Sequence, residues 1–131
     1  MQNRVVHFEI QADNIERAIK FYQDVFDWKI NQWEQNQYWM IMTAHKDSKE
    51  PGINGGLLPR PAKTAPTECG ANSFVCNIQV DNYDAMAEKI IAAGGTVTIS
   101  KYALSGMAWQ GYFLDTEGNN FGLHQADANA K

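Results

Sequence analysis

The same order of predicted elements occurs twice along this chain of 131 residues, and this repeat limits the possible folds more than any other feature. Residues 5–10 alternate in polarity, as a half-buried strand does, and residues 13–26 place apolar side chains three and four positions apart, as a helix does. Three further strands are predicted at residues 28–33, 38–42 and 56–58. The order returns at residues 74–80, 83–91, 96–99, 109–114 and 120–125.

Matching residues support the repeat. Asp13-Asn14 and Asp81-Asn82 each open a predicted helix, and the same shift carries His7 onto Val75. One helix on a four-stranded sheet leaves a sheet face open, so the halves are expected to fold together. The predicted fold is α+β, with two tandem βαβββ modules that form a cupped mixed sheet with the helices on its outer face. This single domain would comprise module one at about 4–58, a linker at about 59–72 and module two at about 73–126.

Composition excludes several classes of partner. The net charge of −4 argues against a nucleic-acid-binding face, which needs clustered basic residues. No apolar run approaches the roughly 18 residues that span a bilayer, so no membrane contact is expected. The first ten residues lack the basic and then apolar pattern of a signal peptide. A cytoplasmic location is therefore the expectation.

Strand alternation divides the expected sheet into an apolar and a polar face. Val6, Phe8 and Ile10 should pack on the first helix, and Cys76 should be a small buried side chain on the corresponding face of module two. Polar groups that converge beside apolar walls are typical of small-molecule sites. The candidate ligand-binding residues are His7, Glu9, Asn77, Gln79, Trp109, Tyr112 and His124.

His7 and Glu9 are the candidate catalytic residues, because imidazole titrates near neutrality and a carboxylate two residues away shares its face. His7, Glu9 and His124 could also form a displaced metal site. The competing interpretation is that His7 is a core histidine hydrogen-bonded to a neighbour. Arg60, close to the expected mouth of the cup, is a candidate contact for an anionic ligand.

Four segments together resemble the vicinal oxygen chelate superfamily, which contains glyoxalases, extradiol dioxygenases and fosfomycin- and bleomycin-resistance proteins. They are Val5–Ile10, Asp13–Trp28, Gly55-Gly56-Leu57 and Asp115–Leu123. The resemblance covers about residues 4–126. It implies paired βαβββ modules, a cupped sheet and a homodimer.

The resemblance also implies a divalent metal held by residues of the first and last strands of each module. The matching positions here are His7, Gly56, Val75 and Gly122, of which only His7 has a ligating side chain. A catalytic zinc site typically keeps three protein ligands. No metal is therefore expected at the usual family site, although a divalent metal elsewhere stays possible.

Three functions follow as alternatives. The first is a small-molecule-binding protein of the glyoxalase/bleomycin-resistance type, with a degenerate metal site and a ligand held in the cup. The second is a metal-dependent lyase or dioxygenase with a rearranged site, in which the ion acts as a Lewis acid and Glu9 or His7 accepts a proton. The third is a structural or regulatory module with a closed cup.

Overall fold

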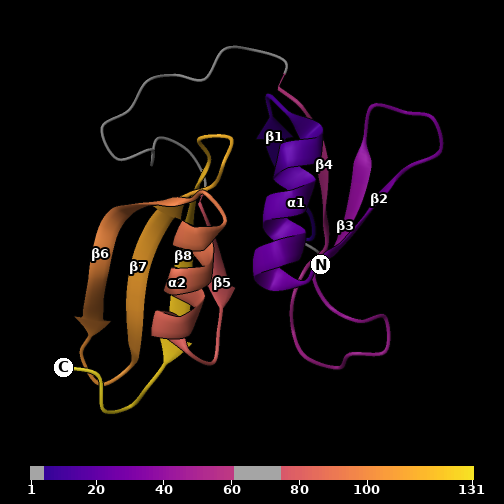
Figure 1. Ribbon diagram of the computed structural model, residues 1–131. Helices are drawn as coiled ribbons and strands as arrows, with labels where there is room; N and C mark the ends of the chain where they lie inside the picture. The colour runs from indigo at the N-terminus through magenta and orange to yellow at the C-terminus, as the bar shows by residue number, and fades with distance from the viewer. Residues whose placement is uncertain (1–4, 61–74) are drawn as a thin grey trace. The chain divides into compact units, whose positions relative to one another are not determined.

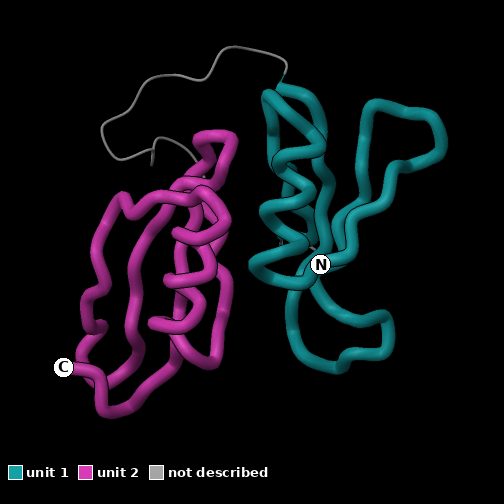
Figure 2. Tube along the Cα trace, in the orientation of Figure 1, with its two compact units in different colours: residues 1–63 teal, residues 64–131 magenta. Residues whose placement is uncertain are grey.

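The computed structural model describes residues 5–60 and 75–131. The chain divides into two units, residues 1–63 and residues 64–131, which are called module one and module two below (Figure 2). Each module contains one helix and one four-stranded sheet (Figure 1).

Module one has the strand order β1-β4-β3-β2. β1 runs parallel to β4, and the other neighbouring pairs are antiparallel. Its elements are β1 (Phe8–Ala12), α1 (Ile15–Phe26), β2 (Lys29–Gln32), β3 (Trp39–Met42) and β4 (Gly55–Pro59).

Module two repeats this arrangement with the order β5-β8-β7-β6. β5 is parallel to β8, and the remaining pairs are antiparallel. Its elements are β5 (Cys76–Gln79), α2 (Tyr83–Ala92), β6 (Thr96–Leu104), β7 (Ala108–Leu114) and β8 (Asn120–Ala126). The predicted fold class, α+β with two βαβββ modules, is therefore confirmed.

The two helices begin in the same way. The side chain of Asn14 accepts a hydrogen bond from the Arg17 backbone N–H at 3.0 Å, and Asn82 does the same for Ala85 at 3.0 Å. An N-cap side chain satisfies a helix N–H group that has no carbonyl partner within the helix. In both predicted opening pairs, Asp13-Asn14 and Asp81-Asn82, the second residue is the N-cap.

The core of module one lies between α1 and its sheet. The helix buries Ala18, Phe21, Tyr22 and Val25, and the sheet buries Ile30, Ile41 and Leu57. The Tyr22 ring stacks on the Trp28 ring, with centroids 5.1 Å apart. This packing uses one face of the sheet.

The core of module two lies between α2 and its sheet. Tyr83 and Ile90 are buried on the helix, and Phe113, Phe121 and Leu123 are buried on β7 and β8. The helix is followed by Gly94, whose φ of +100° is a conformation that glycine adopts without steric cost.

Three expectations about the strands need correction. β1 begins at Phe8, and Val6 is 67% exposed instead of packing on a helix. Cys76 is exposed instead of buried. The predicted linker at 59–72 begins inside β4, and its residues 61–72 lie outside the described residues, as does Phe74.

Candidate functional site

The face of the module-one sheet opposite α1 carries the predicted polar residues. Glu9 on β1 pairs with Gly56 on β4, which pairs with Met40 on β3. Directly paired residues of neighbouring strands point to the same face. Tyr38 is two residues from Met40, so strand alternation directs it to this face as well.

The Tyr38 hydroxyl connects the two residues predicted as catalytic. His7 Nε2 lies 2.8 Å from Tyr38 Oη. The hydroxyl also makes a side-chain hydrogen bond with Glu9. His7 and Glu9 are both exposed, and Tyr38 is half-buried. The structure therefore brings His7 and Glu9 together through a phenol.

Burial and the neighbouring carboxylate change the acidity of this phenol. Desolvation, followed by the hydrogen bond to Glu9 and its negative charge, raises the pKa of Tyr38 from 10.0 to about 12. All three effects disfavour the phenolate. Tyr38 therefore keeps its proton at neutral pH and donates a hydrogen bond to Glu9.

Gly56 makes room for this hydroxyl. A Cβ atom added at Gly56 would overlap the hydroxyl oxygen and the ring of Tyr38. Glycine in a strand admits close approach by a neighbouring group. Tyr38 thus occupies the space in which any side chain at position 56 would begin.

Module two carries a corresponding row of polar side chains. Gln110 Nε2 donates to Asn77 Oδ1 at 2.5 Å, and Gln110 Oε1 lies 2.8 Å from His124 Nδ1. Gln110 is only 4% exposed, so this pairing satisfies a buried amide. Asn77 pairs with Gly122, and a Cβ added at Gly122 would overlap Asn77 Oδ1.

The remaining predicted residues divide between the two faces of this sheet. Gln79 pairs with His124, and Tyr112 pairs with Gly122, so both lie on the polar face. Trp109 alternates with Gln110 and therefore points to the opposite face. Trp109 and Tyr112, predicted as members of one site, do not share a sheet face.

Trp109 has structural contacts on its own face. Its indole Nε1 donates to Asp127 Oδ2 at 3.0 Å, and Lys101 Nζ lies 4.6 Å from its ring centroid. The same ammonium group is 3.1 Å from Asp84 Oδ1. A cation over an aromatic face is an attractive arrangement, so Trp109 helps to hold β6 and β7 together.

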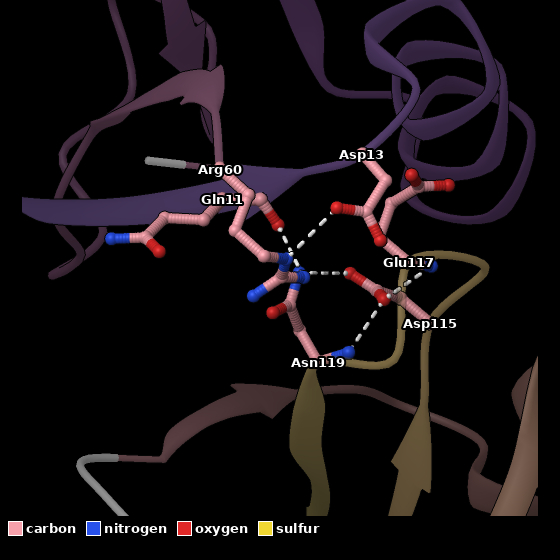
Figure 3. A network of polar contacts seen from close by, with 6 residues as sticks. All are labelled: Gln11, Asp13, Arg60, Asp115, Glu117 and Asn119. Atoms are coloured by element: carbon pink, nitrogen blue, oxygen red, sulfur yellow. Dashed lines mark hydrogen bonds and ion pairs between the residues drawn. The ribbon is translucent and has the colours of Figure 1, made fainter. Parts of the chain in front are cut away.

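Arg60 contacts two residues of its own module (Figure 3). Its Nε donates to Asp13 Oδ1 at 3.2 Å, and an Nη2 hydrogen goes to the Gln11 carbonyl oxygen at 3.2 Å. The Arg60 side chain is 9% exposed. Both contacts place the guanidinium just after the end of β4.

The acidic motif of the last hairpin has a structural function (Figure 3). Asp115 Oδ1 accepts the backbone N–H groups of Glu117 at 2.8 Å and Asn119 at 2.9 Å. Gly118 has a φ of +81°, which suits the tight return between β7 and β8. The motif shapes a turn in this structure.

The residues present do not fit the metal site that the family resemblance implies. Gly56 and Gly122 lie beneath the polar ends of Tyr38 and Asn77, and Val75 offers no ligand. Within residues 5–60 and 75–131, no three His, Cys, Asp or Glu side chains gather as a metal-binding group.

Two members of these clusters are not among the candidate residues predicted from the sequence. They are Tyr38, in the predicted strand 38–42, and Gln110, in the predicted strand 109–114. A glutamine inside the apolar run Trp109–Leu114 was a usable signal, because a buried amide requires hydrogen-bond partners. No comparable signal connects Tyr38 with His7, since only the strand register brings them together.

The N-terminal part of the sequence matches a known protein family. Residues 4–44 match the family model described as bleomycin resistance protein-like N-terminal. No curated protein gave a match to the sequence.

In the part of the chain that the structure describes, no helix is long and apolar enough to cross a membrane.

Several solved structures share the fold at low sequence identity. A glyoxalase/bleomycin resistance protein/dioxygenase family enzyme from Burkholderia phytofirmans is 20% identical, with a TM-score of 0.70 and coverage of 92% of this chain and 97% of that chain. The fosfomycin resistance protein FosX from Listeria monocytogenes is 16% identical, with a TM-score of 0.73 and coverage of 97% and 96%.

A variant of the same Listeria protein was solved with Mn(II) and 1S,2S-dihydroxypropylphosphonic acid. It is 18% identical to this chain, with a TM-score of 0.70 and coverage of 95% of this chain and 90% of that chain. The similarity predicted from sequence motifs is thereby confirmed for the fold and for the N-terminal segment.

Proposed function

We propose that this chain, which has the fold of the glyoxalase/bleomycin resistance/dioxygenase superfamily, is a small-molecule-binding protein with a degenerate metal site. Each module offers polar ligand contacts on its own sheet face. His7, Glu9 and Tyr38 supply these contacts in module one. Asn77, Gln79, Tyr112 and His124 supply them in module two.

One observation carries the proposal. The last-strand glycines Gly56 and Gly122 both lie beneath the polar end of a side chain from a neighbouring strand. Hydrogen-bonding groups therefore stand where the family resemblance implies metal ligands. A neutral phenol or amide can orient a polar ligand, but neither replaces the carboxylate, imidazole or thiolate donors typical of divalent metal sites.

Within this proposal His7 and Glu9 are ligand contacts first. Their shared hydrogen-bonding partner fixes the position of the imidazole relative to the carboxylate. A base acts only within hydrogen-bond reach of the proton that it accepts. A bound ligand that places an acidic O–H or N–H beside this pair would allow His7 or Glu9 to accept that proton as a base. The present geometry favours ligand binding without such a proton transfer.

The test is isothermal titration calorimetry with bleomycin and with fosfomycin, the compounds that occur in the names of the relatives. The protein is titrated in excess EDTA and again with Mn(II). We expect at least one compound to bind in EDTA with an affinity that Mn(II) does not change. The Tyr38→Phe and Asn77→Ala variants should bind it more weakly, and the matched surface variant Glu88→Gln should bind it normally.

Two results would contradict the proposal. Failure of both compounds to bind in EDTA, with binding restored by Mn(II), would instead support the metal-dependent lyase or dioxygenase. Failure of both under every condition would favour a structural or regulatory module. Elemental analysis of the purified protein provides an independent check, because a degenerate site predicts no stoichiometric transition metal.

A further inference from the structure

An exposed indole lies next to the module-one cluster. The backbone N–H of Trp33 donates to the Tyr38 carbonyl oxygen at 2.9 Å, which continues the pairing of β2 with β3 beyond Gln32. Trp33 and Tyr38 therefore point to the same face. Their ring centroids are 6.4 Å apart in an edge-to-face arrangement, and Trp33 is 55% exposed.

Glu9 adds negative charge to this surface. Its carboxylate accepts the Tyr38 proton and retains further lone pairs, because an ionised carboxylate is an acceptor only. Among the residues that the structure describes, Glu9 forms no ion pair. A cationic ligand group would therefore gain an attraction that no described side chain already satisfies.

The imidazole of His7 lies beside the same hydroxyl. Tyr38 donates a hydrogen bond to Glu9, and His7 Nε2 is 2.8 Å from the Tyr38 oxygen. The ring therefore adds a polar group to the surface that Glu9 and Tyr38 form.

We infer that Trp33, Tyr38, Glu9 and His7 form a binding site for an organic ammonium group. This inference rests on the proposed function and names the ligand class for its module-one face. An alkylammonium matches each element of the site. Its charge is attracted by the indole face and by the carboxylate, and its N–H groups supply donors for the acceptor Glu9.

The surrounding charges agree with this ligand class. Glu34 follows Trp33 in the turn before β3 and adds a second carboxylate to this end of the hairpin. Lys29 shares the face, but it lies four residues from Trp33, about 13 Å at the usual strand rise. Its Nζ is 3.4 Å from Asp27 Oδ1, so its charge is partly compensated there.

The test uses three probes of one shape: benzylammonium, benzyltrimethylammonium and benzyl alcohol. Each is titrated into the full chain at constant ionic strength, and backbone amide shifts in two-dimensional NMR identify the residues affected. We expect benzylammonium to bind most tightly and benzyl alcohol most weakly, by about three- to tenfold. Shifts should centre on residues 7–9 and 33–38.

Variants assign the contributions. Trp33→Ala should weaken both cations by about two- to fivefold, and the control Met107→Ala, also a large exposed side chain, should weaken neither. Glu9→Gln should reduce the preference for cations, whereas Glu88→Gln on α2 should leave it unchanged. Benzyltrimethylammonium has no N–H group, so its binding reports the charge and ring contacts alone.

Separate outcomes overturn the inference and the proposed function. Equal binding of benzyl alcohol and benzylammonium at these residues would refute ammonium recognition while leaving a small-molecule site in place. If no probe shifts residues 7–9 or 33–38, ammonium recognition is refuted at this face. Drug binding in the calorimetric test would then still support the proposed function on its own.

Discussion

At the scale of single residues, two adjacent glycines predict different costs of substitution. A Cβ at Gly55 would meet the Phe8 backbone oxygen at 2.5 Å and the Phe8 ring at 2.7 Å, and backbone cannot move aside easily. The nearest atoms to a Cβ at Gly56 belong to the far end of the Tyr38 side chain. We expect Gly55→Ala to lower the free energy of unfolding by about 1–3 kcal/mol and Gly56→Ala by less than about 1 kcal/mol.

Urea denaturation of both variants measures this difference. Gly56→Ala should nevertheless displace the Tyr38 hydroxyl from His7, and the His7 ring resonances report that change. Equal destabilisation by the two substitutions would show that Tyr38 is fixed as firmly as the backbone of β1.

The Tyr38 phenol also predicts a pH dependence. Its pKa in the folded chain is raised from 10.0 to about 12. The stabilisation from its hydrogen bonds is therefore complete below pH 10 and is lost as the pH rises through about 12. The difference in phenolate absorbance between the wild type and Tyr38→Phe isolates this titration. A midpoint at pH 10 would mean that neither burial nor Glu9 disfavours the phenolate of Tyr38.

At the scale of elements, the two helix starts predict a matched pair of effects. Asn82→Ala removes the acceptor for the Ala85 N–H and should cost about 1 kcal/mol of stability. The neighbouring Asp81 is exposed and caps nothing, so Asp81→Ala should change stability by no more than about 0.5 kcal/mol. Thermal unfolding of both variants checks the pair, and a larger loss for Asp81→Ala would reverse the assignment of the cap.

The order of elements was predictable from the sequence because periodicity and turn residues are local properties. The start of β1 was not predictable in this way. Val5 and Val6 are residue types typical of strands, but the strand begins only at Phe8. The ladder with β4 begins at the pair Phe8 and Gly55, and pairing partners are set by register. Local pattern alone could not show where that partner strand begins.

The candidate site was predictable to a smaller extent. His7 and Glu9 were identified because alternation places them on one face, and the structure joins them through Tyr38. That tyrosine comes from another strand of the sheet, so no spacing in the sequence reports the contact. Trp109 and Tyr112 were predicted together as aromatic residues of the site. They are three positions apart on β7, so strand alternation directs them to opposite faces of the sheet.

At the scale of the whole molecule, we expect a homodimer. The family resemblance implies one, and the edge strand β6 exposes apolar side chains, with Val97 49% and Ile99 39% exposed. An edge strand with unpaired backbone groups is a ready pairing surface. Light scattering after gel filtration should give twice the 14.7 kDa mass of the chain. A mass of 14.7 kDa at micromolar concentration would contradict the expectation.

The shared space of Tyr38 and Gly56 makes the two positions epistatic. A carboxylate at position 56 cannot be accommodated while the tyrosine remains, and removal of the tyrosine alone leaves His7 and Glu9 without their common partner. Each single step toward a metal-binding sequence therefore loses an interaction before it gains one. A double-mutant cycle with Tyr38→Ala and Gly56→Glu should show a favourable coupling energy. The pair Tyr38 and Gly56 therefore disfavours a carboxylate at position 56, whichever ligand the chain binds.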